Sequence, residues 1–291
     1  MRQISIARLL VSLAALSAML APVETARGAD ADPDRTAQIS GRETAIWLPP
    51  GTEGPHPLVL FSHGAGGCNT QSAFLMRALA QDGMLVAAPD HKDEGTNCPM
   101  GRPNPEDLPL AFLMNSANWQ PAFYDDRRED LQELWAALQA DPAYAGLIDP
   151  ERVALVGHSL GGYTVLALAG AWPTWKTQGI AAVVALAPFA QPFASGAPFA
   201  IDVPVLFQAG TADELTPPRV VRGAFARTAA ACIVVYRDAD HFAWTGPKSA
   251  YEDAVAAATV AFLDEVFAGG SPKAAMLASP QTDGGEQCKP D

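Results

Sequence analysis

Residues 153–162, Val-Ala-Leu-Val-Gly-His-Ser-Leu-Gly-Gly, constrain the fold of this chain more than any other segment. A valine-rich run typical of a buried strand leads into Gly-x-Ser-x-Gly, and a helix-forming run follows over residues 163–171. A strand-to-helix turn this sharp needs glycines on both sides of the serine, because side chains there would collide with the crossing backbone. The pattern predicts a strand, a tight turn and a helix, with Ser159 exposed at the apex as a nucleophile.

A serine nucleophile needs a general base, and the position of the histidines indicates which one serves. In chains with this turn, the order along the sequence is nucleophile, acid, base. His241 is the only histidine that follows Ser159 with any separation. His158 adjoins the serine, where successive side chains diverge. We therefore predict that His241 is the base. The chain has five histidines: His56, His63, His91, His158 and His241.

The acid is predicted by elimination. No carboxylate lies between Lys176 and Ile201, so the loop after the predicted strand 180–185 cannot supply one. The next predicted strand, residues 204–209, leads directly to Asp213, which could accept a hydrogen bond from Nδ1 of His241. Glu214 is the alternative for this role, and the more remote alternatives are Asp202, Asp238 and Asp240.

A second backbone donor is expected from an earlier strand. Residues 57–62 form an apolar run that ends in the glycine-rich loop His-Gly-Ala-Gly-Gly, residues 63–67. Such a loop allows backbone N–H groups to approach a substrate carbonyl without obstruction. We predict an oxyanion hole formed by the backbone N–H groups of Ala65 and Leu160.

The first 28 residues read as a signal peptide. Arg2 and Arg8 precede a short apolar run over residues 9–21, and small residues follow near position 28. The predicted mature chain, residues 29–291, is long enough for one α/β domain. Its acidic character, with a formal net charge of −13 for the whole chain, argues against nucleic acid or a stable membrane anchor. We predict an exported protein, periplasmic or secreted.

Four cysteines in the exported part suit an oxidising compartment. Cys68 and Cys98 follow strands whose ends share one edge of a parallel sheet, so Cys68–Cys98 is one predicted pair. Cys232–Cys288 is then the other. Spacings typical of metal ligands are absent from the sequence, and the predicted chemistry needs no metal and no cofactor.

Strands alternating with helices predict a mostly parallel central sheet with helices on both faces and a small cap or none. Helices are expected over residues 72–81, 125–140 and 251–267, and an early edge strand over residues 44–48. The long loop 91–124 is a candidate lid. Aromatic residues near 119–123, 172–175 and 189–199 either wall an acyl pocket or pack beneath loops, and both readings stay open. Residues 268–291 read as a flexible tail.

Three blocks of sequence resemble a known group of enzymes: residues 58–67, residues 85–91 and residues 157–162. They are similar to dienelactone-hydrolase-like α/β-hydrolases, and within these to platelet-activating-factor acetylhydrolase-like enzymes, near secreted cutinases and polyester hydrolases. The resemblance implies the α/β-hydrolase fold, Ser159, Asp213 and His241 as triad, and Ala65 and Leu160 as oxyanion donors. It departs from true dienelactone hydrolases, which use a cysteine nucleophile.

These observations together predict an exported serine hydrolase that cleaves carboxylic esters, with short acyl chains favoured. The expected partner is a small-molecule or polymeric ester. The alternatives are a polyester depolymerase, a peptidase with the same triad and, more remotely, a non-catalytic binding protein on the same fold.

Overall fold

A computed structural model describes residues 31–51, 54–92, 109–246 and 249–289. Within these residues nine strands form one sheet, in the order β1-β2-β4-β3-β5-β6-β7-β8-β9. Strands β4, β3, β5, β6, β7 and β8 run parallel, and β1, β2 and β9 pair antiparallel at the two edges. The strands are β1 (Arg35–Ile39), β2 (Arg42–Trp47), β3 (His56–Ser62), β4 (Leu85–Pro89), β5 (Ile148–His158), β6 (Ala182–Leu186), β7 (Val205–Gly210), β8 (Ala231–Tyr236) and β9 (Gln287–Cys288).

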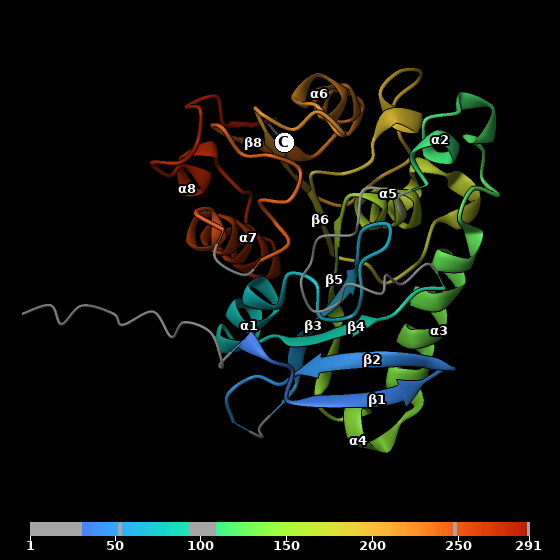
Figure 1. The fold of residues 1–291 in the computed structure, drawn as a ribbon. Coiled ribbons are helices and arrows are strands. Elements are labelled where there is room, and N and C mark those ends of the chain that lie inside the picture. Colours follow the sequence, from blue (N-terminus) through green and yellow to red (C-terminus); the bar gives the residue numbers. More distant parts are fainter. Residues whose placement is uncertain (1–30, 52–53, 93–108, 247–248, 290–291) are drawn as a thin grey trace, which may run out of the picture.

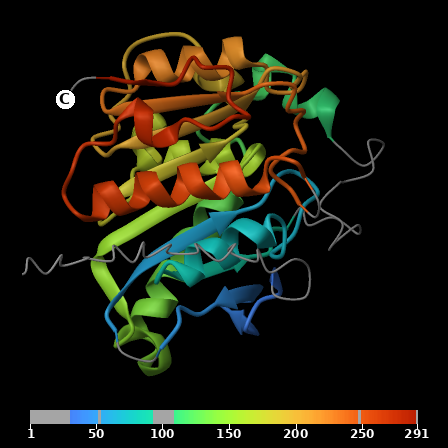
Figure 2. The ribbon, with the colours of Figure 1, turned by 90° about the vertical axis from the view of Figure 1, so that its left-hand side faces the viewer.

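Helices cover both faces of this sheet (Figure 1). The longer helices are α1 (Ala73–Gln81), α3 (Asp125–Ala140), α5 (Leu160–Leu166), α6 (Pro218–Arg227) and α7 (Glu252–Phe267), and the short ones are α2 (Leu110–Leu113), α4 (Pro142–Ala145) and α8 (Ala274–Leu277). Helices α1, α7 and α8 pack on one face, and α3, α4, α5 and α6 pack on the other. Figure 2 shows α7 lying along the sheet.

The strands are apolar on both sides because helices cover both faces. In β3, Leu58 and Leu60 face α3 and α5, whereas Val59 and Phe61 face α1, and all four are buried. A strand that alternates between two covered faces reads as a continuous apolar run. Burial on both faces therefore accounts for the unbroken apolar runs that located the central strands in the sequence.

Most predicted elements are confirmed, with α3 at its predicted bounds. The edge is different, because β1 lies outside β2, which is therefore not the edge strand. Strand β1 has the sequence Arg-Thr-Ala-Gln-Ile and is largely exposed, so no apolar pattern marks it.

The prediction of a flexible tail is wrong for its described part. Helix α8 buries Leu277 against the face that α7 covers, and β9 adds to the sheet beside β8. A four-residue helix and a two-residue strand are too short to produce a periodic pattern, so neither could be recognised from its residues alone.

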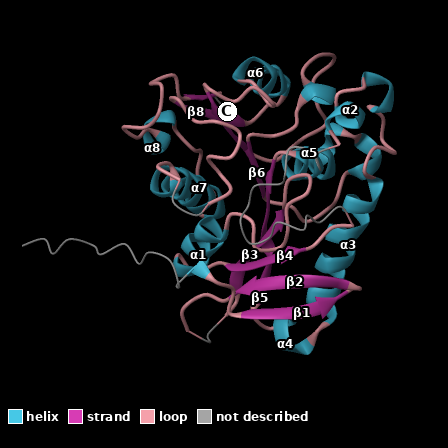
Figure 3. Ribbon diagram, viewed as in Figure 1, coloured by secondary structure: helices cyan, strands magenta, loops and turns pink. Residues whose placement is uncertain are grey.

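Because β4, β3, β5, β6, β7 and β8 pair in parallel, their carboxyl ends lie at one edge of the sheet. The loops that follow β3, β5, β7 and β8 therefore meet there. They carry Ala65, Ser159, Asp213 and His241 respectively. Figure 3 distinguishes the strands from the loops that join them to the helices.

Candidate active site

Ser159 sits at a strained turn between β5 and α5. Its backbone has φ 55° and ψ −115°, a conformation that non-glycine residues adopt only when the surroundings enforce it. A Cβ atom at Gly157 would collide with the carbonyl oxygen of Gly161, and one at Gly161 would collide with the carbonyl oxygen of Ser62. Both glycines are required for the reason predicted from the sequence.

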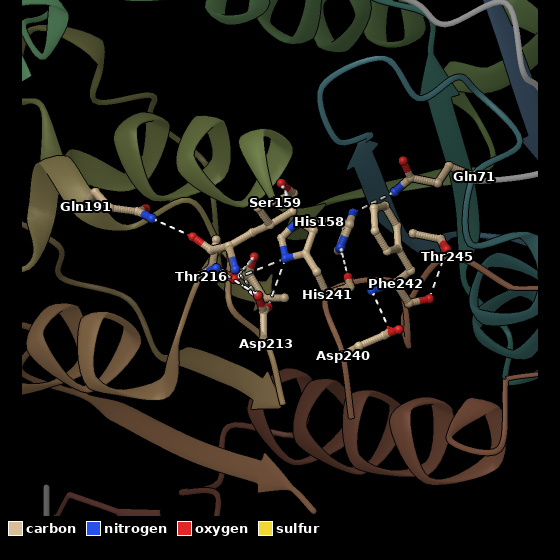
Figure 4. Close-up of polar contacts among 12 residues, drawn as sticks. Gln71, His158, Ser159, Gln191, Asp213, Thr216, Asp240, His241, Phe242 and Thr245 are labelled. Atoms are coloured by element: carbon tan, nitrogen blue, oxygen red, sulfur yellow. Dashed lines mark hydrogen bonds and ion pairs between the residues drawn. The ribbon is translucent and has the colours of Figure 1, made fainter. Parts of the chain in front are cut away.

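The three predicted polar residues form one hydrogen-bonded series. Ser159 Oγ lies 2.8 Å from His241 Nε2, and His241 Nδ1 lies 2.8 Å from Asp213 Oδ2. Figure 4 shows the imidazole of His241 between the hydroxyl and the carboxylate. All three are at least partly buried, whereas the alternative acid, Glu214, is exposed. The geometry suits transfer of the serine proton to Nε2.

Asp213 is held as a carboxylate by several donors. Its Oδ1 accepts from the backbone N–H groups of Leu215 (2.9 Å) and Thr216 (2.8 Å), and its Oδ2 accepts from Thr216 Oγ1 (2.7 Å). Burial alone would raise the pKa of Asp213, but the hydrogen bond and charge of His241 and the hydrogen bonds from Thr216 hold that pKa below its usual value. Sequence reasoning missed Thr216, although an aspartate followed closely by threonine commonly forms such a local turn.

His158 is buried and neutral, and it does not contact the Ser159 hydroxyl. Burial, followed by the neighbouring His241, lowers the pKa of His158 to about 3. Its Nε2–H donates to the carbonyl oxygen of His241 (2.9 Å), and its Nδ1 accepts from Nε2 of Gln71 (3.0 Å), as Figure 4 shows. His158 therefore connects the loop that carries His241 to the loop that follows β3.

Ala65 and Leu160, the two predicted oxyanion donors, both lie near Ser159. Leu160 N is the first N–H of α5, which has no partner within its own helix. Ala65 follows Gly64, where an added Cβ would lie 3.3 Å from Cβ of Ser159. Neither N–H has an acceptor among the described residues, so both are available to a ligand.

Comparison with known families agrees with this geometry. Residues 53–199 match the model of the family described as serine aminopeptidase, S33. The chain belongs to this family. It is accordingly a serine hydrolase of the α/β-hydrolase fold. The match includes the loop after β3 and the turn at Ser159, and it ends before Asp213 and His241. No curated protein matches the chain in a sequence comparison.

The hydrolase has a hollow of about 530 Å³ at Ser159, part of it open to solvent. Its lining is mostly apolar, and none of the described lining residues carries a carboxylate. The lining residues are Gly64, Ala65, Gln71, Leu110, Leu113, Met114, His158, Ser159, Phe189, Leu215, Thr216, His241 and Phe242.

The aromatic residues that the sequence singled out divide between the two readings. Phe189 lines the hollow, but Phe193 stacks on Tyr163 with ring centroids 5.2 Å apart, and Trp175 is buried beside the same tyrosine. For these two, packing beneath loops is the correct reading.

The candidate lid, residues 91–124, is described only in part, because residues 93–108 lie outside the described residues. Its described end forms α2, and Leu110, Leu113 and Met114 from this end make one wall of the hollow. This end of the segment belongs to the site.

The predicted Cys232–Cys288 disulfide is confirmed and joins β8 to β9. Cys98 lies outside the described residues, so the Cys68–Cys98 pair stays a prediction, as does the signal peptide over residues 1–28. The described part of the hydrolase holds no cluster of three metal-ligating side chains. None of its described helices combines the length and the apolar character needed to cross a membrane.

Proposed function

We propose that this hydrolase cleaves carboxylic esters with short apolar acyl groups through an acyl-enzyme intermediate. Ser159 is the nucleophile, His241 the base and Asp213 the residue that orients it. The observation that carries the proposal is the pair of 2.8 Å hydrogen bonds that join these three side chains at the floor of an apolar hollow.

The reaction follows from this arrangement. Ser159 Oγ attacks the ester carbonyl carbon while its proton passes to Nε2 of His241. The imidazolium that forms is stabilised by the carboxylate of Asp213, and the carbonyl oxygen, now negative, accepts hydrogen bonds from the N–H groups of Ala65 and Leu160. The alcohol leaves with the proton from His241. Water then attacks the acyl-enzyme by the same route and releases the acid.

The lining of the hollow favours an ester over the substrate of an aminopeptidase. An aminopeptidase must hold the charged amino terminus of its substrate, which requires a carboxylate or several carbonyl groups near the nucleophile because an unpaired ammonium is costly to bury. Around Ser159 the described lining offers Leu113, Phe189, Leu215 and Phe242 instead. The family description makes aminopeptidase the second candidate.

We also propose that the protein is exported. The Cys232–Cys288 disulfide supports this, because such bonds persist in oxidising compartments. The resemblance to acetylhydrolase-like and polyester-hydrolase-like enzymes belongs to the same proposal, and it makes a polymeric ester the alternative substrate.

The test compares substrates on the purified protein and on Ser159→Ala. Nitrophenyl esters from acetate to palmitate, aminoacyl nitroanilides and a polyester film are offered in parallel. We expect turnover to be highest for short esters, and to fall by about 10⁶ in Ser159→Ala. Ser195→Ala is the matched control, since Ser195 is exposed and away from the hollow. Faster cleavage of the nitroanilides would establish the aminopeptidase instead.

A further inference from the structure

The carbonyl group of Gly64 is held by three donors, all from the protein itself. It accepts from the backbone N–H of Gly67 (3.0 Å), from Nδ1 of His63 (2.7 Å) and from Nη2 of Arg127 (3.3 Å). Arg127 comes from α3, is fully buried, and also donates through Nη1 to the carbonyl oxygen of His63 (2.7 Å). A buried guanidinium thus donates hydrogen bonds to two successive carbonyl groups of the loop after β3.

The direction of this carbonyl decides the direction of the next N–H. The peptide between Gly64 and Ala65 is trans, because the one cis bond of the described residues is Gly54–Pro55. In a trans peptide the C=O and the following N–H point in opposite directions. With the Gly64 oxygen turned to the side of Arg127, the N–H of Ala65 points to the opposite side.

We propose that Arg127 and His63 are positioning residues that hold the Gly64–Ala65 peptide with its N–H directed at the oxyanion. The inference rests on the proposed function, because it assigns these residues a role through the Ala65 donor. Gly64 itself lies against Ser159, with 3.3 Å between its added Cβ and Cβ of the serine. A donor fixed before the substrate arrives needs no reorganisation during the reaction, which is the source of its catalytic benefit.

The proton of His63 is placed by a second buried network. His63 Nε2 accepts from the backbone N–H of His91 (3.0 Å), so the proton of a neutral His63 is on Nδ1, where it donates to Gly64. The ring of His91 lies between Ser62 Oγ (2.9 Å) and Asp130 Oδ2 (2.8 Å).

This second serine–histidine–aspartate series copies the hydrogen-bond order of the catalytic one. Ser62 is 0% exposed and His91 is 1% exposed, so no substrate reaches the hydroxyl. The contact of this series with the loop after β3 is the hydrogen bond from the backbone N–H of His91 to Nε2 of His63.

The other side of the same loop is fixed as well. The N–H of Gly64 donates to Oε1 of Gln71 (3.2 Å), and Gln71 in turn donates to His158. A Cβ atom at Gly67 would collide with Oε1 of Gln71, so this glycine makes room for the contact. The N–H group and the C=O group of Gly64 therefore both have hydrogen-bond partners within the protein.

The first test is Arg127→Lys. A lysine presents one ammonium group and lacks the planar fork that reaches two carbonyl groups at once. We expect kcat on a short ester to fall by about 10- to 100-fold. This decrease is smaller than the decrease of about 10²–10³ that follows complete removal of an oxyanion donor. KM should stay within about threefold, because the donor acts in the transition state. Arg128→Lys, the adjacent and more exposed arginine of α3, is the matched control and should match the wild type.

The second test replaces His63 in two ways. Asparagine places its amide nitrogen near the position of Nδ1 and keeps a donor for Gly64, whereas glutamine places its amide near Nε2 and removes that donor. We expect His63→Asn to stay within about threefold of wild-type kcat and His63→Gln to fall by about tenfold or more. Equal losses in both variants, in proportion to their loss of thermal stability, would overturn the positioning role.

A trifluoromethyl ketone analogue of the ester separates this role from general stability. Its adduct with Ser159 carries the oxyanion, so its inhibition constant should weaken in parallel with kcat, while that of the unreactive methyl ketone stays unchanged. Wild-type kcat and inhibition in Arg127→Lys and His63→Gln, with Ser159→Ala inactive, would overturn the inference alone. Activity in Ser159→Ala would overturn the proposed function itself.

If the variants do not fold, the wild-type protein carries the test. In a crystal structure of the protein inactivated with a fluorophosphonate, the phosphoryl oxygen should accept from Ala65 N while the Gly64 carbonyl faces Arg127. An oxygen held by Leu160 N without Ala65 N would refute the proposal.

Discussion

Asp213→Asn should nearly abolish turnover, because the structure dictates how the new amide lies. Oδ1 of Asp213 accepts from two backbone N–H groups, those of Leu215 and Thr216, and only the oxygen of an asparagine amide can take that place. The amide nitrogen then occupies the position of Oδ2, 2.8 Å from Nδ1 of His241. Two donors would face each other unless His241 moves its proton from Nδ1 to Nε2.

A proton on Nε2 blocks the reaction, since this atom must accept the proton of Ser159. The wrong tautomer in such a triad reduces turnover by about 10⁴, which corresponds to about 5 kcal/mol in the activation free energy. The fold should survive, because Thr216 Oγ1 also lies 3.0 Å from the carbonyl oxygen of Ala187 and can donate there.

The assay is steady-state hydrolysis of a short nitrophenyl ester, with thermal unfolding measured on the same preparation. Glu214→Gln, which changes the exposed neighbouring carboxylate, serves as the control and should keep full activity. A folded Asp213→Asn variant within tenfold of wild type would refute the reasoning, and loss of activity in Glu214→Gln alone would show that the other carboxylate is the acid.

Three further predictions concern the fold. Gly161→Ala should lower the free energy of unfolding by about 3 kcal/mol or more, because the added Cβ would collide with the carbonyl oxygen of Ser62. Gly146→Ala is the control and should keep the wild-type urea midpoint, because no atom lies within 4 Å of a Cβ added there. Burial lowers the pKa of His158 to about 3, so between pH 6.5 and pH 3 only the unfolded chain binds a proton at this residue. The contribution of the neutral ring to the free energy of unfolding should therefore be fully present above pH 6.5 and decline as the pH falls toward 3. A urea midpoint that stays unchanged over this range would contradict the burial of the neutral ring. Replacing Cys232 and Cys288 with serine should lower the free energy of unfolding by about 2–4 kcal/mol. The kcat should stay unchanged, because the disulfide joins β8 and β9 at the edge of the sheet, and a loss of kcat in the folded variant would contradict this.

Local patterns in the sequence were sufficient for much of this protein. Strands β4 and β6 are buried throughout, and β3 and β5 are buried over residues 58–62 and 153–158, so each of the four contributes an apolar run to the sequence. The turn at Ser159 has a recognisable five-residue pattern because a side chain at either of its glycines would collide with nearby backbone atoms. Chain order then indicated Asp213 and His241, since loops after parallel strands meet at one edge.

What only the tertiary structure decided is the set of contacts between segments distant in the sequence. Arg127 reaches Gly64 across 63 positions, and Gln71 reaches His158 across 87. No local pattern marks such residues, because an arginine in an amphipathic helix reads as a solvated charge. Strand β1 and strand β9 were not predicted from the sequence for a related reason. Their order comes from pairing with neighbouring strands, so their own residues carry no period.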